Sequence, residues 1–271
     1  MQGLSHFIPT QTKITYLNQL LQVGFHTLDF GSFVSPKAVP QMQDTAQVLA
    51  GLDTRNSRTE LLAIVANHRG AESAAGFGEI KHLGFPLSVS ETFQQRNTNK
   101  SVGEALKEVA RIQDLCLARE KNLVVYLSMG FGNPYGDPYS PQLVVDFAGK
   151  LESLGIRTVA PSDTVGSSSA ESIEELFSQL IPAFPQLEFG AHLHSVPAQA
   201  EVKIEAAYRA GGRRFDGAIR GFGGCPMATD KLTGNIPTES ILSVFEKGQI
   251  KVALDAPAFK KAWQMAASVF A

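Results

Sequence analysis

Short apolar runs of strand length alternate with amphipathic segments of helical length along almost the whole chain. The run L-L-A-I-V-A at 61–66 is typical of a strand that is buried on both faces, as in parallel sheets covered by helices. Alternation of this kind requires helical crossovers between parallel strands. The pattern predicts one domain, residues 1–271, with strands at 26–30, 61–66, 86–90, 123–128, 158–161, 187–194 and 214–219.

The predicted helices identify the fold class. They cover 12–23, a segment beginning near 39–41, then 69–75, 101–121, 141–154, 170–180, 198–210, 238–247 and 257–270. A (β/α)8 TIM barrel has eight strands, each followed by its own helix, but the helix at 12–23 has no strand before it. We therefore expect an α/β TIM barrel that lacks its first strand in this chain. Either the open edge pairs with another copy or the sequence begins downstream of its natural start, and we favour the second interpretation, an N-terminal truncation.

Composition excludes several classes of protein. Hydrophobic residues make up 44% and charged residues 18% of the chain, as in a globular enzyme. The net charge of -2 gives no reason to expect binding to nucleic acid or to an anionic membrane surface. The apolar runs are too short to span a bilayer. Two cysteines cannot form a disulfide framework, and the first residues do not resemble a signal peptide, so we expect a cytoplasmic location.

Two histidines occupy alternate positions at the end of a predicted strand. His192 and His194 point to the same side of that strand, so both imidazoles can converge on one ion. In TIM barrels the active site lies at the carboxyl ends of the strands. One core histidine and one surface histidine remain an equally weighted alternative for so short a motif.

A glycine-rich loop follows the next strand. It reads R-G-F-G-G-C-P at 220–226 and continues into T-G-N at 233–235. Cys225 on this loop can act as an acid or a nucleophile if its thiol is partly exposed, although free cysteines are often small core residues. Asn235 offers a side-chain oxygen of the kind that a hard divalent cation accepts.

Two aspartates also lie in or at the end of predicted strands. Asp163, in S-D-T-V-G at 162–166, either orients a bound group or serves as a turn or N-cap residue. Asp29 is either an acid at the catalytic rim or an ion-pair partner of a lysine or arginine on a neighbouring strand.

Several segments together resemble the 3-hydroxy-3-methylglutaryl-CoA (HMG-CoA) lyase family, part of a wider group of metal-dependent lyases and synthases with TIM barrels. The similarity lies in F-G-S-F-V-S-P-K-A-V-P-Q-M at 30–42, E-T-F at 91–93 with N-T-N at 97–99, S-D-T-V-G at 162–166, A-H-L-H at 191–194 and G-G-C-P at 223–226. The motifs occur in the same order and cover essentially the whole chain. The most specific are S-F-V-S-P-K and G-G-C-P.

The resemblance implies roles for the candidate residues. His192, His194 and Asn235 would bind a divalent cation, Mg²⁺ or Mn²⁺. Two imidazoles alone would suggest a later transition metal, so the identity of the metal comes from the resemblance. Cys225 would be the thiol that protonates the departing enolate.

Three further positions follow from the same resemblance. Asp163 and Gln2 match polar positions that line the family's site, and Asp29 stands where the family has a glutamate. The family also has an Arg-Asp pair a few residues before the position of Gln2, and Met1 falls just after it. That pair supplies a fourth metal ligand and a cation that stabilises the enolate, so we expect the 271-residue chain itself to be inactive or nearly so.

The implied reaction is cleavage of HMG-CoA to acetoacetate and acetyl-CoA, as in leucine degradation, although the pathway stays open. The partner would be a small acyl-CoA substrate. Dimers are common in the family, so a homodimer is one expected state, although no sequence feature independently indicates an interface. Two rivals remain, namely a related synthase or aldolase that uses acyl-CoA or 2-oxo acids, and a non-catalytic barrel that binds acyl-CoA.

Overall fold

The computed structural model describes residues 1, 4, 6–224 and 233–270. Within them, parallel strands form one sheet in the order β1-β2-β3-β4-β5-β6-β7. The strands are β1 (Thr27–Ser32), β2 (Glu60–Ile64), β3 (Ile80–Ser88), β4 (Asn122–Ser128), β5 (Thr158–Asp163), β6 (Glu188–Leu193) and β7 (Arg214–Phe215). The helices are α1 (Thr10–Val23), α2 (Thr45–Ala50), α3 (His68–Ala75), α4 (Glu91–Thr98), α5 (Val102–Ala118), α6 (Pro141–Ser153), α7 (Ala170–Ala183), α8 (Pro197–Arg209), α9 (Thr238–Lys247) and α10 (Ala256–Val269), with 3₁₀ turns at Pro40–Met42 and Ile219–Gly221. No helix in this part of the chain has the length and hydrophobicity needed to cross a bilayer.

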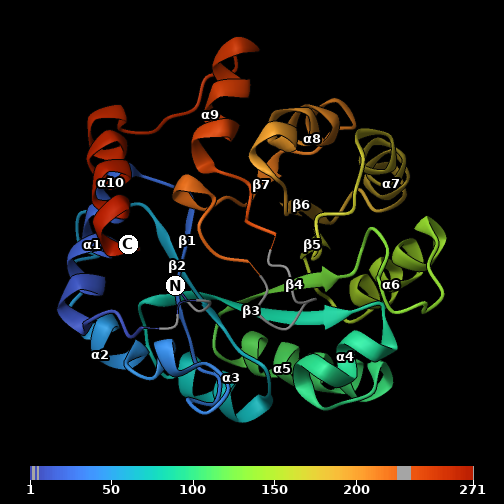
Figure 1. The fold of residues 1–271 in the computed structure, drawn as a ribbon. Helices are drawn as coiled ribbons and strands as arrows, with labels where there is room; N and C mark the ends of the chain where they lie inside the picture. The colour runs from blue at the N-terminus through green and yellow to red at the C-terminus, as the bar shows by residue number, and fades with distance from the viewer. Residues whose placement is uncertain (2–3, 5, 225–232, 271) are drawn as a thin grey trace.

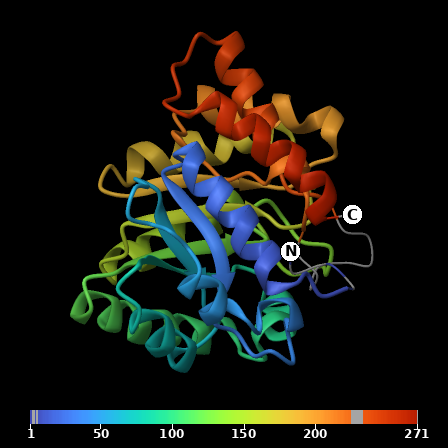
Figure 2. The ribbon, with the colours of Figure 1, turned by 90° about the vertical axis from the view of Figure 1, so that its left-hand side faces the viewer.

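The sheet curls into a half-barrel, and the helices surround its outer side (Figure 1). This arrangement confirms the predicted TIM-barrel class, with strand order equal to sequence order. The first and last helices, α1 and α10, pack side by side (Figure 2). The rings of Tyr16 and Phe270 meet edge to face at 5.7 Å, and the amide of Gln19 donates to the carbonyl of Ala258.

Alternation along β1 and β6 separates an apolar outer face from a more polar inner face. On β1, Leu28 and Phe30 are buried in the hydrophobic core beneath the helices, whereas Asp29 points to the inside of the curl. On β6, Ala191 and Leu193 belong to the same core, and His192 between them faces inward. The curl therefore gathers polar side chains from distant strands inside the barrel.

A capping box marks the start of α5, within the helix predicted at 101–121. The Ser101 hydroxyl accepts a hydrogen bond from the Glu104 amide, and the Glu104 carboxylate accepts one from the Ser101 amide. These two bonds satisfy amide groups that the first turn of a helix cannot pair internally. Local sequence alone thus determines where this helix begins.

Several predicted bounds were wrong. The strand expected at 86–90 is Ile80–Ser88, because its first residues pair with β2 and residues 82–88 pair with β4, despite the polar side chains at its start. The strand expected at 214–219 stops at Phe215, because the Ala218 amide bonds to Ile236 and not to β6. The segment near 39–41 forms only a 3₁₀ turn, and α4 was not predicted.

Candidate active site

The carboxyl end of β6 lies beside a segment that is 41 residues further along the chain. His194 and Asn235 form an antiparallel bridge. On either side of it, the Ser195 amide donates to the Gly234 carbonyl and the Ile236 amide donates to the Leu193 carbonyl. Two of the three predicted metal-ligating residues are therefore neighbours through their main chains, and His192 lies two residues away on β6.

The two histidine rings are held in a similar way. Their centroids are 5.7 Å apart. Nδ1 of His192 lies 3.1 Å from Oδ2 of Asp216, and Nδ1 of His194 lies 3.1 Å from the carbonyl oxygen of Thr233. Because Nδ1 is engaged in both rings, Nε2 is the nitrogen left to bind a ligand. A metal-binding histidine typically has its second ring nitrogen fixed by a carboxylate or carbonyl in this way.

The donor set fits a divalent cation. Burial, and next the charge of nearby His192, lower the pKa of His194 to about 4, so the imidazole is neutral at pH 7, as a metal ligand must be. The Asn235 amide nitrogen donates to the carbonyl of Phe222, which leaves the amide oxygen as the acceptor. In the described part of the chain there is no group of three His, Cys, Asp or Glu side chains placed for a metal; the set here is two imidazoles and an amide.

Asp216 is a site residue that our sequence reasoning missed. Burial alone would raise its pKa, but the hydrogen bond to His192 and the charges of His192 and Arg214 outweigh that effect and lower it. Arg214 in turn donates to Glu188 at 2.8 Å. The available signal was the position of Asp216 directly after the last strand, where barrel enzymes place functional side chains.

Asp163 ends β5 and is buried, with 1% of its surface exposed. Its Oδ2 accepts hydrogen bonds from the Ser168 hydroxyl at 2.5 Å and from the Lys203 ammonium at 2.8 Å. This geometry corresponds to the turn-stabilising alternative, with a buried ion pair added. The catalytic role implied by the resemblance stays a prediction.

Asp29 points inside the barrel and keeps contact with solvent. The protein atoms packed around it, only partly offset by the N-terminal amine and His192, raise its pKa to about 7. The structure thus places this carboxyl within electrostatic reach of a predicted metal ligand on the far side of the curl, and no lysine or arginine side chain among the described residues forms an ion pair with it.

Two predicted residues, Gln2 and Cys225, lie outside the described residues. The loop leading to Cys225 is described as far as Gly224, and its glycines at 221, 223 and 224 have positive φ values of 66°, 103° and 144°. A Cβ on Gly223 would approach the Asn235 amide nitrogen to 2.7 Å. Glycine is therefore required there by both backbone conformation and the closeness of Asn235.

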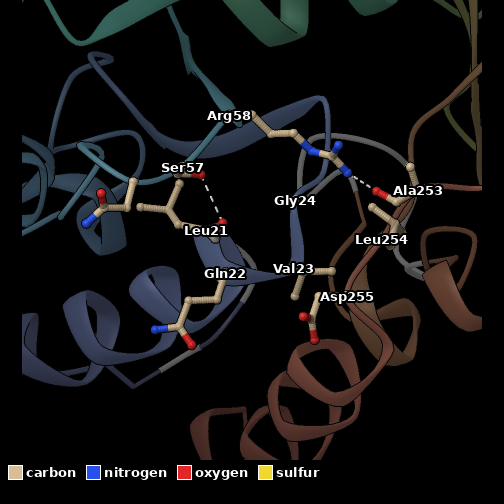
Figure 3. A pocket seen from close by; sticks show the side chains of 10 residues that line it. Leu21, Gln22, Val23, Gly24, Ser57, Arg58, Ala253, Leu254 and Asp255 are labelled. Carbon is tan, nitrogen blue, oxygen red and sulfur yellow. Dashed lines mark hydrogen bonds between the residues drawn. The ribbon is translucent and has the colours of Figure 1, made fainter.

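A pocket of about 510 Å³ lies elsewhere, at the amino ends of β1 and β2. Figure 3 shows Gly24, Arg58 and Asp255 around it, with Arg58 hydrogen-bonded to the carbonyl of Ala253. In barrels of this kind the amino-terminal face serves stability, while chemistry occurs at the carboxyl ends. We therefore locate the candidate active site around His194 and not in this pocket.

Known proteins resemble this chain over nearly its whole length. The chain is 32% identical over 251 residues to hydroxymethylglutaryl-CoA lyase of Bacillus subtilis, covering 93% of this chain and 83% of that protein. It is 31% identical over 269 residues to 3-hydroxy-3-isohexenylglutaryl-CoA/hydroxymethylglutaryl-CoA lyase of Pseudomonas aeruginosa, covering 99% and 89%. A solved HMG-CoA lyase from Acinetobacter baumannii, in complex with coenzyme A and 3-methylmalate, superposes with a TM-score of 0.90 at 27% identity, covering 99% and 88%. The sequence model of the family described as HMGL-like matches residues 1–266, and the chain therefore belongs to the HMGL-like family.

Proposed function

We propose that this protein is a divalent-metal-dependent carbon–carbon lyase that cleaves HMG-CoA to acetoacetate and acetyl-CoA. The observation that carries the proposal is the pairing of Asn235 with His194, two residues from His192, at the carboxyl end of β6. Relatives named as HMG-CoA lyases at about 30% identity over most of their length support the same reaction.

The chain's own residues would act as follows. His192, His194 and Asn235 would hold a divalent cation, Mg²⁺ or Mn²⁺. Such an ion would polarise the 3-hydroxyl and carbonyl oxygens of the substrate, which eases transfer of the hydroxyl proton to solvent water. Asp216 keeps the His192 ring oriented through Nδ1. As the bond between C2 and C3 breaks, its electron pair forms the enolate of acetyl-CoA, and the Cys225 thiol would donate the proton that converts this enolate to product.

The remaining expected roles are proposals of the same kind. Gln2 and Asp29 would contact the substrate, and Asp163 would shape the site from the end of β5. An acyl-CoA is the expected small-molecule partner, in keeping with the coenzyme A bound by the Acinetobacter baumannii relative. A homodimer, the cytoplasmic location and the role in leucine degradation remain predictions.

The test is a cleavage assay with HMG-CoA, in which acetoacetate and acetyl-CoA are both quantified with Mg²⁺ or Mn²⁺ and after chelation. We expect equimolar products that disappear with chelation, using protein purified from cells that express it naturally. Metal-independent cleavage, or turnover only with a 2-oxo acid, would refute the proposal.

Acyl-group preference is tested in the same assay. The name of the Pseudomonas aeruginosa relative includes two substrates, which differ in the group attached to C3. Comparing kcat/KM for HMG-CoA and its isohexenyl analogue would show which acyl group this protein prefers. We expect the methyl compound to be the better substrate.

A further inference from the structure

A buried lysine connects the ends of two strands at the candidate active site. Lys203 lies in α8 and only 2% of its surface is exposed. Its ammonium group donates to Oδ2 of Asp163 at 2.8 Å, to the carbonyl of His194 at 2.9 Å and to the carbonyl of Gly166 at 3.1 Å. An ammonium group has three protons, so each of them has an acceptor.

These three acceptors belong to two different segments. Asp163 is the last residue of β5 and Gly166 lies in the turn that follows, which is also held by the Ser168 amide and hydroxyl donating to the Asp163 carboxylate. His194 follows β6 directly. Lys203 therefore fixes the turn after β5 and the main chain of a predicted metal ligand relative to each other.

A second connection joins the same two segments through Thr233. Its hydroxyl donates to the Val165 carbonyl at 3.1 Å, and its carbonyl oxygen lies 3.1 Å from Nδ1 of His194. Gly166 lies so close to Thr233 that a Cβ on this glycine would come within 2.6 Å of the threonine methyl group. The His194 ring and its main chain are thus attached to one turn by two routes, and Asn235 is two residues beyond Thr233.

We propose that Lys203 is a positioning residue of the metal site. By fixing the His194 carbonyl and the turn that Thr233 contacts, it holds Nε2 of His194 and the amide oxygen of Asn235 in one arrangement before the ion binds. Stability alone does not account for this lysine, because a buried ion pair adds little net stability over an apolar pair of the same size. Groups that hydrogen-bond to metal ligands and hold them in place, in contrast, strongly influence metal affinity. This inference rests on the proposed metal-dependent function.

The experiment compares Mn²⁺ affinity, measured from the electron paramagnetic resonance signal of free Mn²⁺, with the melting temperature of the metal-free protein. The test variant is the double substitution Lys203→Met with Asp163→Asn, which removes the lysine without leaving a buried charge. Asp163→Asn alone keeps the lysine and its bonds to His194 and Gly166. The matched control is Lys13→Met with Asp44→Asn, which removes another buried ion pair, 2.7 Å long, between α1 and the residue before α2.

We expect the Lys203 double variant to bind Mn²⁺ at least about tenfold more weakly than the wild type. Asp163→Asn alone and the Lys13 control should stay within about threefold, even where their melting temperatures fall. Unchanged affinity in a folded Lys203 double variant would overturn the inference alone, and so would an equal loss in the Lys13 control. A wild-type protein that binds no Mn²⁺ would overturn the proposed function and this inference with it.

Discussion

Asp216 offers the sharpest test of how the histidines are oriented. Its Oδ2 lies 3.1 Å from Nδ1 of His192, and its own position is supported by Arg214. Asparagine at this position can still accept a hydrogen bond from Nδ1 but lacks the charge, whereas alanine removes both. The two substitutions therefore separate the electrostatic part of the interaction from the orientation of the ring.

Loss of a residue that hydrogen-bonds to a metal ligand typically lowers the affinity for the metal by about 10- to 100-fold. We expect Asp216→Asn near the lower limit, about 1.4 kcal/mol of binding free energy, and Asp216→Ala near the upper limit, about 2.8 kcal/mol. Isothermal titration of the metal-free protein with Mn²⁺ measures both values. Circular dichroism establishes that each variant is folded.

Glu188→Gln is the matched control. Glu188 accepts a hydrogen bond from Arg214 at 2.8 Å, so this change disturbs the same arginine without touching His192. Its Mn²⁺ affinity should stay within about twofold of the wild type. If a folded Asp216→Ala protein also binds Mn²⁺ with wild-type affinity, the carboxylate does not orient His192 for metal binding and our reasoning about the site is wrong.

Three further predictions concern single groups. Ser101→Ala should lower the free energy of unfolding by about 1 kcal/mol, because it removes the α5 cap; equal urea midpoints for the two proteins would contradict this. Burial raises the pKa of Cys116 to about 12, so a Cys225→Ser variant should show no rapidly reacting thiol with Ellman's reagent at pH 8 until it is unfolded. The raised pKa of Asp29 means that the folded state holds its proton more tightly than the unfolded state, so stability should fall as pH rises from about 4 to 7. Asp29→Asn should therefore raise the melting temperature more at pH 8 than at pH 5, and an equal change at both pH values would count against this assignment.

Most of the fold followed from local sequence patterns. The segments predicted as helices at 101–121 and 141–154 are α5 and α6, because serine and proline at their starts stabilise the adjacent helical turn. The short β7 was predicted too long, because the bond from the Ala218 amide to Ile236 depends on a distant segment. The start of β3 was missed because its pairing with β2 and β4 outweighs the polar side chains at 81 and 82.

The candidate site, like the fold, was predicted from the sequence only in part. Alternation on a strand was enough to put His192 and His194 on one side, and the strand end was enough to put them at the catalytic rim. The bridge between His194 and Asn235, the carboxylate of Asp216 behind His192 and the burial of Lys203 against Asp163 came only from the structure. Sequence periodicity determines which face of its own element a side chain occupies, because that depends on backbone geometry alone. Which distant side chain it meets is decided by how the curled sheet and its helices pack together.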